Sequence, residues 1–191
     1  MQAISEADSM KKYDQLVDSA MQLFYKQGFH ATGVDQLSKQ GDVTKKTLYR
    51  YFPTKEALVQ AALRRRDEVF MDRMRAKLEA RPLSERPAAY VDFIIGWTRE
   101  PDFHGCAFIN AAAEYGESND GAHVVAAEHK RTIREYLERL CVEAGMAVPQ
   151  AAAAQLFLIG EGLTVAAQVC GLDEALEQQA RVLAGALTAR R

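Results

Sequence analysis

Apolar residues recur at helical spacing at the start of the chain. Between residues 13 and 24 they stand three and four positions apart, which predicts a first amphipathic helix. Gly28 follows that helix, and glycine commonly ends helices in a left-handed conformation. A short second helix is expected to carry Val34 and Leu37, after which Gly41 allows a tight turn.

A third helix is predicted over residues 45–52. Thr44 precedes it as an N-cap, and Pro53 stops it, because proline lacks the amide proton and disfavours helical geometry in the residue before it. Thr54 then begins a fourth, long helix, which we expect to run to the break at Arg81-Pro82. Two short helices joined by a glycine-containing turn are typical of a helix-turn-helix, whose second helix enters the DNA major groove.

The rest of the chain also predicts helices. We expect them near 84–99, 105–117, 121–145, 149–170 and 173–190, separated by Pro, Gly and Asp residues in cap or break positions. Sustained strand alternation and internal repeats are absent from the sequence. The fold class is therefore expected to be all-α: an N-terminal three-helix helix-turn-helix domain over residues 1–55, followed by a larger helical ligand-binding and dimerisation domain over residues 56–191.

Charge divides the chain in the same way. The net charge of −2 hides a value of +4 in residues 1–66 and −6 in the remainder. A basic N-terminal part is the electrostatic pattern expected of a DNA-binding surface. With 48% hydrophobic residues, the chain can bury a substantial core and is not expected to be disordered.

The residues of the predicted helix-turn-helix carry a family resemblance. The runs 28–37 (GFHATGVDQL) and 41–58 (GDVTKKTLYRYFPTKEAL) resemble the N-terminal signature of tetracycline-repressor (TetR) family regulators. The family order of Tyr, one variable residue, His or Tyr, Phe, a turn, Lys and Glu is met by residues 49–56. Many members have glycine where Lys46 stands, so base contacts near that position differ here. The resemblance implies a homodimeric repressor that binds a palindromic double-stranded operator and responds to a small-molecule inducer.

Ten residues are expected to contact DNA. Thr32, Thr44 and Lys55 lie at helix N-termini, where amides, hydroxyls and a cation favour phosphate and set the register. Long donors on the third helix could reach guanine edges, and a threonine methyl could meet thymine. A cluster of cations on its own is more often a solvated helix face. The full predicted set is Thr32, Gly33, Thr44, Lys45, Lys46, Thr47, Tyr49, Arg50, Tyr51 and Lys55.

The last two predicted helices carry apolar stripes with small residues that permit close helix approach. Intrachain core would explain one such stripe, but the family pairs these helices into a four-helix bundle across a two-fold axis. Two recognition helices about 34–36 Å apart can then read a palindrome. The predicted dimer interface comprises Leu156, Ile159, Gly160, Leu163, Ala167, Leu176, Ala180, Leu183 and Leu187.

By the same analogy, the inducer site lies inside the larger domain beside the long fourth helix. Aromatic and methionine positions at helical spacing are usually plain core, so only the set is suggestive, and it favours an apolar or aromatic inducer. The candidates are Phe70, Met74, Phe93, Trp97, Phe103, Cys106, Phe108, Asn110 and Phe157.

Cys106 has a second interpretation. It is expected at the start of a helix beside His104, and both a helix dipole and a protonated imidazole would favour its thiolate. The segment is similar to one in family members that sense oxidants or electrophiles through a cysteine. Oxidant sensing is thus an alternative function, although a buried, inert thiol is the commoner state.

Other function classes find little support. Phosphate loops, GxSxG, HExxH and paired cysteine ligands are absent, and the histidines are isolated, so neither an enzyme nor a metal or cofactor site is expected. The polar, acidic N-terminus and the lack of about 18 uninterrupted apolar residues predict a cytoplasmic protein without a membrane span. The remaining alternative is a helical interaction protein that does not bind DNA sequence-specifically.

Overall fold

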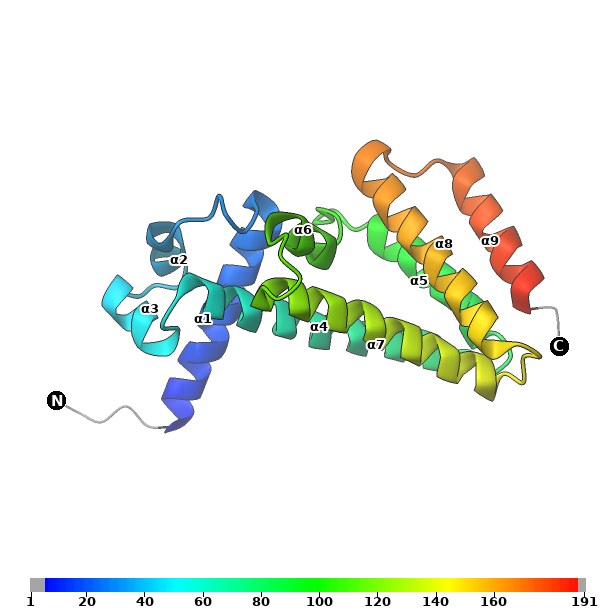
Figure 1. The fold of residues 1–191 in the computed structure, drawn as a ribbon, viewed down its shortest axis with the longest axis horizontal. Coiled ribbons are helices and arrows are strands. Elements are labelled where there is room, and N and C mark those ends of the chain that lie inside the picture. The colour runs from blue at the N-terminus through cyan, green and yellow to red at the C-terminus, as the bar shows by residue number, and fades with distance from the viewer. Residues whose placement is uncertain (1–5, 189–191) are drawn as a thin grey trace. The chain divides into compact units, whose positions relative to one another are not determined.

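The computed structural model of the chain describes residues 6–188. Residues 1–5, which begin the segment predicted to be too polar for a signal peptide, and residues 189–191, which include the end of the last predicted helix, lie outside it. Within the described range the structure is all-helical, as predicted. Its helices are α1 (Glu6–Gln27), α2 (Val34–Gln40), α3 (Lys45–Tyr51), α4 (Lys55–Glu79), α5 (Arg86–Thr98), α6 (Ala107–Glu114), α7 (Gly121–Glu143), α8 (Pro149–Cys170) and α9 (Glu174–Thr188) (Figure 1).

The chain forms two compact units. The described part of the first comprises residues 6–68 and 107–127, and that of the second comprises residues 69–106 and 128–188. Both α4 and α7 therefore run from one unit into the other. The functional boundary expected at residue 55 remains a prediction. The compact units themselves divide inside α4, and α6 belongs to the same unit as the N-terminal helices.

The first unit is built around α1. Leu16, Phe24 and Phe29 are almost completely buried, and the rings of Phe24 and Phe29 stack with centroids 5.3 Å apart. Gly28 has a φ of 92° and directs the chain out of α1, as the sequence predicted. The first half of α4 contacts α1 as well, since Arg65 Nε lies 3.2 Å from Asp18 Oδ1.

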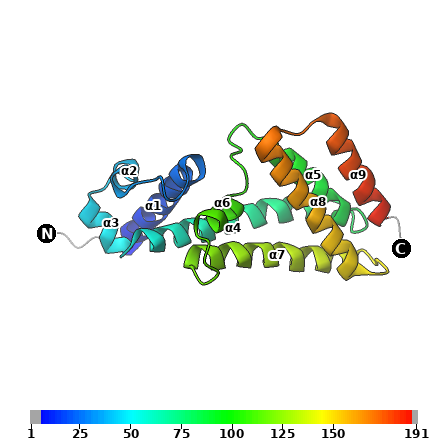
Figure 2. The same cartoon turned by 45° about the horizontal axis from the view of Figure 1, so that its top comes forward.

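In the second unit, α5 packs against both α8 and α9 (Figures 1 and 2). Gly160 of α8 allows a close approach to α5, because a Cβ there would clash with the ring and hydroxyl of Tyr90. Tyr90 is 1% exposed, and its burial raises the pKa of its hydroxyl. The second half of α4 meets α7 where the Tyr136 hydroxyl donates to Glu79 Oε1 at 3.3 Å.

One helix stands out for its hydropathy. Within residues 6–188, α8 is the helix that is long and apolar enough to cross a membrane by length and composition. Core helices meet the same criterion, and α8 packs on α5 and α9. Packing on α5 and α9 thus explains the apolar residues on the buried side of α8. It does not explain the apolar residues on its exposed side.

Candidate nucleic-acid interface

The connection between α2 and α3 is a tight turn of residues 41–44. The amides of Gly41 and Val43 donate to Leu37 O and Ser38 O, both at 2.9 Å. Gly41 has no room for a side chain, because a Cβ there would clash with Leu16 of α1. Asp42 follows with a φ of 49°, the left-handed region that aspartate tolerates better than most residues. This turn sets the angle at which α3 leaves α2.

Helix α3 is capped and amphipathic, as predicted. The Thr44 hydroxyl accepts the Thr47 amide at 3.1 Å, and Phe52 closes the helix by donating its amide to Leu48 O. Leu48 and Phe52 are buried at 3% and 4% exposure, so the opposite side of α3 faces outward. That outward side carries Lys45, Lys46, Tyr49 and Arg50, all exposed, with Thr47 half-buried.

Two predicted contact residues already have partners within the unit. Lys45 Nζ lies 2.5 Å from Asp35 Oδ1 of α2, and this hydrogen bond raises the pKa of the exposed ammonium. Tyr51 accepts a hydrogen bond from Ser9 Oγ at 3.4 Å, which lowers the pKa of its hydroxyl, and Arg50 lies over its ring. Both α3 side chains are thus oriented before any ligand binds.

Thr32 requires a correction. Its side chain is fully buried, and its hydroxyl donates to Gly28 O at 2.7 Å, so this hydroxyl is not available to a phosphate. The residue that caps α2 is Gly33, whose amide donates to Gln36 Oε1 at 2.9 Å. Thr32 lies close to the start of α2 in the sequence. A difference of one position along the chain is enough to decide whether its hydroxyl faces inward or outward.

Glu114 of α6 is a residue that sequence reasoning missed. Its carboxylate accepts the amides of Phe29 at 2.9 Å and His30 at 2.5 Å, and lies 3.2 Å from His30 Nδ1. It also packs beside Gly28, where a Cβ would come within 3.1 Å of it. Lys55, a predicted phosphate contact, donates to His30 O of the same turn at 3.3 Å. Glu114 therefore fixes the turn that leads from α1 to α2.

Tyr115, the residue after Glu114, makes further contacts with the turn between α1 and α2. The Tyr115 ring lies 4.6 Å from that of His30 and 6.3 Å from that of Phe29, and its carbonyl bonds His123 Nδ1 at 2.9 Å. Burial raises the pKa of Tyr115 to about 12. Nothing in the sequence near Gly28 signals this contact, because its partners lie about 85 residues away along the chain.

The predicted ligand residues separate between the two units. Phe108 and Asn110 lie on α6 in the first, whereas Phe70, Met74, Phe93, Trp97, Phe103, Cys106 and Phe157 belong to the second. Within the second unit, Phe70 contacts Phe93, Trp97 and His129 edge to face, at 5.1–5.3 Å between ring centroids. Phe103 meets Trp97 at 5.0 Å. The structure thus brings these aromatic rings into one cluster.

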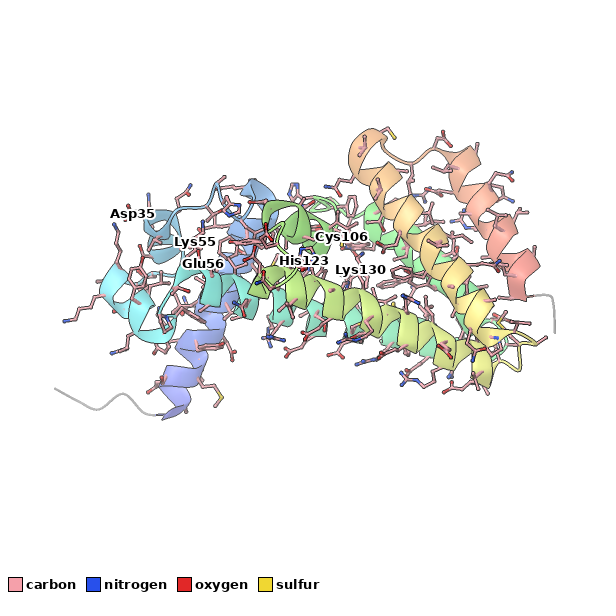
Figure 3. The ribbon with its side chains drawn as sticks, viewed as in Figure 1. Asp35, Lys55, Glu56, Cys106, His123 and Lys130 are labelled. Atoms are coloured by element: carbon pink, nitrogen blue, oxygen red, sulfur yellow. The ribbon has the colours of Figure 1, made fainter. Side chains whose placement is uncertain are left out.

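Cys106 directly precedes α6 and is 3% exposed. Lys130 Nζ lies 3.5 Å from its Sγ and 2.7 Å from Glu161 Oε1 (Figure 3). A lysine is thus a polar neighbour of the thiol, and the His104 side chain is exposed. Within residues 6–188 no group of three or more His, Cys, Asp or Glu is placed to hold a metal ion.

The predicted dimer stripe divides into two sets. Leu156, Gly160, Leu163 and Ala180 are buried inside the chain, so they are corrected to intrachain core, the alternative explanation of such a stripe. Leu176 and Leu183 are exposed, and Ile159, Ala167 and Leu187 are half-buried. Large exposed residues that the sequence analysis did not select complete the outer surface: Leu158, Val165, Val169 and Val182.

Comparison with known proteins places the candidate interface in a family. Residues 16–62 match the family described as "Bacterial regulatory proteins, tetR family". The chain is 31% identical over 96 residues to the HTH-type transcriptional regulator TcmR of Streptomyces glaucescens, covering 48% of this chain and 41% of the relative. It is 30% identical over 135 residues to the HTH-type transcriptional repressor ComR of Escherichia coli, covering 65% and 62%. The chain thus spans less than two thirds of these relatives.

Solved structures match over a longer range. A TetR-family transcriptional regulator from Streptomyces coelicolor superimposes with a TM-score of 0.84 at 26% identity, over 94% of this chain and 95% of that one. The reduced form of NemR from E. coli shares the fold, with a TM-score of 0.81 at 20% identity, over 91% and 95%. These matches extend the likeness from the helix-turn-helix to the helices that follow it.

Proposed function

We propose that the chain is a TetR-family bacterial regulatory protein, a cytoplasmic homodimeric repressor that leaves its operator when an inducer binds. The observation that carries the proposal is α3 itself: a capped helix with Leu48 and Phe52 buried and its outward side exposed. The relatives are transcriptional regulators, in agreement with the expectation that the chain is not an enzyme.

Base contacts are assigned to the outward side of α3. Lys46 and Arg50 are long donors that suit guanine edges, and the exposed Tyr49 can bond a phosphate. Lys55 and Gly33 lie at the starts of α4 and α2, where amides and the helix dipole favour an anion. Lys45 would have to exchange its bond with Asp35 for one with DNA.

Dimerisation is assigned to the outer faces of α8 and α9. Leu158, Val165 and Val169 stand at helical spacing on α8 and are 46–78% exposed, and Leu183 on α9 is 55% exposed. Exposed apolar surface of this kind is typical of a protein–protein interface. A two-fold pair of such faces would present two copies of α3 to successive turns of a palindrome.

Induction is assigned to the second unit. An apolar or aromatic inducer would select a conformer in which the two copies of α3 no longer match the groove spacing, while DNA selects the other conformer. The aromatic cluster around Phe70 and Trp97 supports such a ligand. Inducer and DNA would then weaken each other's binding by the same factor.

DNA binding is tested by selecting duplexes from random pools and measuring fluorescence anisotropy with the selected sequence. Arg50→Ala is expected to cost about 1–3 kcal/mol and to relax the sequence preference, whereas Lys55→Ala should lower the salt slope by about one. Arg131→Ala on α7 removes one exposed charge of the second unit as a control. Indifference of the wild-type protein to every duplex at low salt would refute the proposal.

Dimerisation has its own test. Val169→Glu places a charge on the outer face of α8, where the side chain is 78% exposed, so it should yield folded monomers by light scattering. Lys39→Glu, on the exposed surface of α2, makes a charge change that should leave the dimer intact. A wild-type protein that is monomeric at micromolar concentration contradicts this part of the proposal.

A second candidate function is oxidant sensing through Cys106. The observation that favours it is Lys130 Nζ at 3.5 Å from Sγ, which places a cation directly beside the thiol. Peroxide would oxidise the thiol to a sulfenic acid and release water. DNA affinity should fall after peroxide treatment in the wild type and in Cys170→Ser, but not in Cys106→Ser. Equal loss in all three proteins would exclude this role for Cys106.

A further inference from the structure

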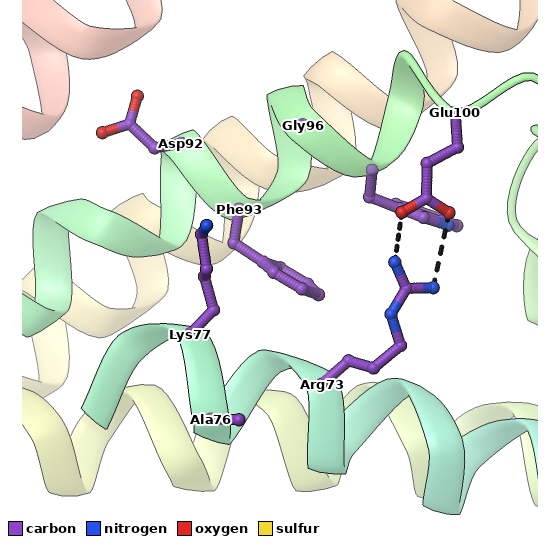
Figure 4. A pocket seen from close by; sticks show the side chains of 8 residues that line it. Arg73, Ala76, Lys77, Asp92, Phe93, Gly96 and Glu100 are labelled. Atoms are coloured by element: carbon purple, nitrogen blue, oxygen red, sulfur yellow. Dashed lines mark hydrogen bonds and ion pairs between the residues drawn. The ribbon is translucent and has the colours of Figure 1, made fainter. Parts of the chain in front are cut away.

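A groove between α4 and α5 of the second unit has a chemical character that the predicted ligand residues do not explain. Its volume is about 520 Å³, within the range of about 300–1,000 Å³ that is typical of small-molecule sites. Phe93 and Trp97 belong to the predicted ligand set, but the charged side chains around them come from positions that the sequence analysis did not select. Figure 4 shows the Lys77 and Arg73 side chains rising from α4 on either side of the Phe93 ring.

The apolar part of the groove is aromatic. Phe93 and Trp97 line it from α5 and are 8% and 6% exposed. Trp97 is held edge to face by Phe70 at 5.1 Å and by Phe103 at 5.0 Å. Gly96 also lines the groove, and a Cβ there would meet nothing within 4 Å. The Trp97 ring is therefore held in place by its aromatic neighbours, and the space beside Gly96 is open.

The charges around the groove do not balance once their pairing is considered. Both Glu100 oxygens accept from the Arg73 guanidinium, and Asp92 Oδ1 accepts from Arg181 Nε at 2.8 Å. The acidic groups of the groove are therefore already matched. Lys77 is exposed, and among residues 6–188 no carboxylate lies within ion-pair distance of its ammonium. Lys77 therefore contributes to the groove a positive charge that no carboxylate of residues 6–188 pairs.

We propose that this groove binds an amphipathic monocarboxylate, with its aromatic or aliphatic body on Phe93 and Trp97 and its carboxylate at Lys77. A cationic ligand would find the acids already paired, and a sugar phosphate would gain little from two aromatic rings. The inference rests on the proposed function, since it names the chemical class of the inducer. It adds Lys77 as the residue that distinguishes an acid from a neutral molecule of the same shape.

Trp97 provides the assay, because it is the single tryptophan of the chain. We would titrate the DNA-free protein with phenylbutyrate, phenylbutanol and phenylbutylamine, and with octanoate as an aliphatic acid, while following tryptophan emission. The acids should bind about threefold to tenfold more tightly than the alcohol, and the amine should bind most weakly. Equal binding of acid and alcohol, tightest binding of the amine, or no response to either acid would overturn the proposal.

Two variants connect the response to the groove. Lys77→Gln should reduce the affinity for phenylbutyrate to that for phenylbutanol and leave the alcohol unchanged. Gly96→Phe should fill the open space and abolish binding, whereas Gly96→Ala, its matched control, should retain it; thermal melting would confirm that all three variants fold. Unchanged phenylbutyrate binding in Lys77→Gln or in folded Gly96→Phe would place the ligand elsewhere and overturn the assignment.

The experiment also separates this inference from the proposed function. Operator affinity is measured without any acid, and acid binding is measured without DNA. Acid binding in a protein that ignores DNA would refute repression and leave the groove assignment intact. Operator binding without acid binding would refute the groove assignment alone.

Discussion

Replacing Glu114 by glutamine is expected to loosen the turn between α1 and α2. In the wild type, the two carboxylate oxygens of Glu114 accept the amides of Phe29 and His30 at 2.9 and 2.5 Å. Glutamine keeps one carbonyl oxygen for one of these amides, but its NH₂ group meets the other donor and cannot bond it. One charge-assisted hydrogen bond is lost, and the remaining one becomes neutral.

The magnitude follows from these two bonds. A hydrogen bond to a charged group contributes about 1.5–3 kcal/mol, and the 27% exposure of the Glu114 side chain argues for the lower end. Glu114→Gln should therefore cost about 1.5 kcal/mol and Glu114→Ala about 3 kcal/mol. For a chain of this length the glutamine variant corresponds to a fall in Tm of about 3–6 °C. Operator affinity should fall too, because α2 loses its fixed connection to α1.

Native-state hydrogen exchange gives the sharpest test. The amides of Phe29 and His30 should exchange faster in Glu114→Gln, while amides in α5 and α8 should be unaffected. Glu117→Gln removes the same charge from an exposed position three residues along the chain and serves as the control. If both variants had the same Tm and the same exchange at residues 29 and 30, the assigned role of Glu114 would be refuted.

Three further outcomes are expected. Gly41→Ala should destabilise the protein by about 1–3 kcal/mol in urea unfolding, because its Cβ would clash with Leu16; an unchanged midpoint would contradict this. Ellman's reagent should label exposed Cys170 quickly in the native protein, but Cys141 only after unfolding, because burial raises the pKa of its thiol to about 11; rapid native labelling of both would be inconsistent. Burial raises the pKa of Tyr136 to about 12, so the unfolded chain releases this proton first and stability should fall between about pH 10 and 12; Tyr136→Phe should flatten that fall in denaturation measured across this range.

Local sequence determined the helices and their ends. Gly28, Thr44 and Pro53 act on neighbouring backbone groups through a left-handed φ, a side-chain cap and a missing amide proton. Such effects reach only a few residues along the chain. The helix-turn-helix and the exposed side of α3 could therefore be predicted from periodicity and caps.

Contacts between distant segments could not be predicted in this way. The sequence around Gly28 contains nothing that specifies a carboxylate on α6 as its partner, and nothing near Thr32 signals that tertiary packing buries its side chain. Whether Lys77 pairs with an acid likewise depends on how α4, α5 and α9 pack, because Arg73 and Arg181 occupy the nearby carboxylates.

The clearest division lies in α8. Its sequence is apolar on almost every side, which establishes a helix that needs burial but not which face receives it. Packing on α5 decided the question, since Gly160 permits the close approach of Tyr90, and Leu156 and Leu163, at i−4 and i+3 from Gly160, are buried on the same side. Helix formation is governed by neighbours along the chain, whereas the choice of buried face depends on the shape of whichever helix lies opposite.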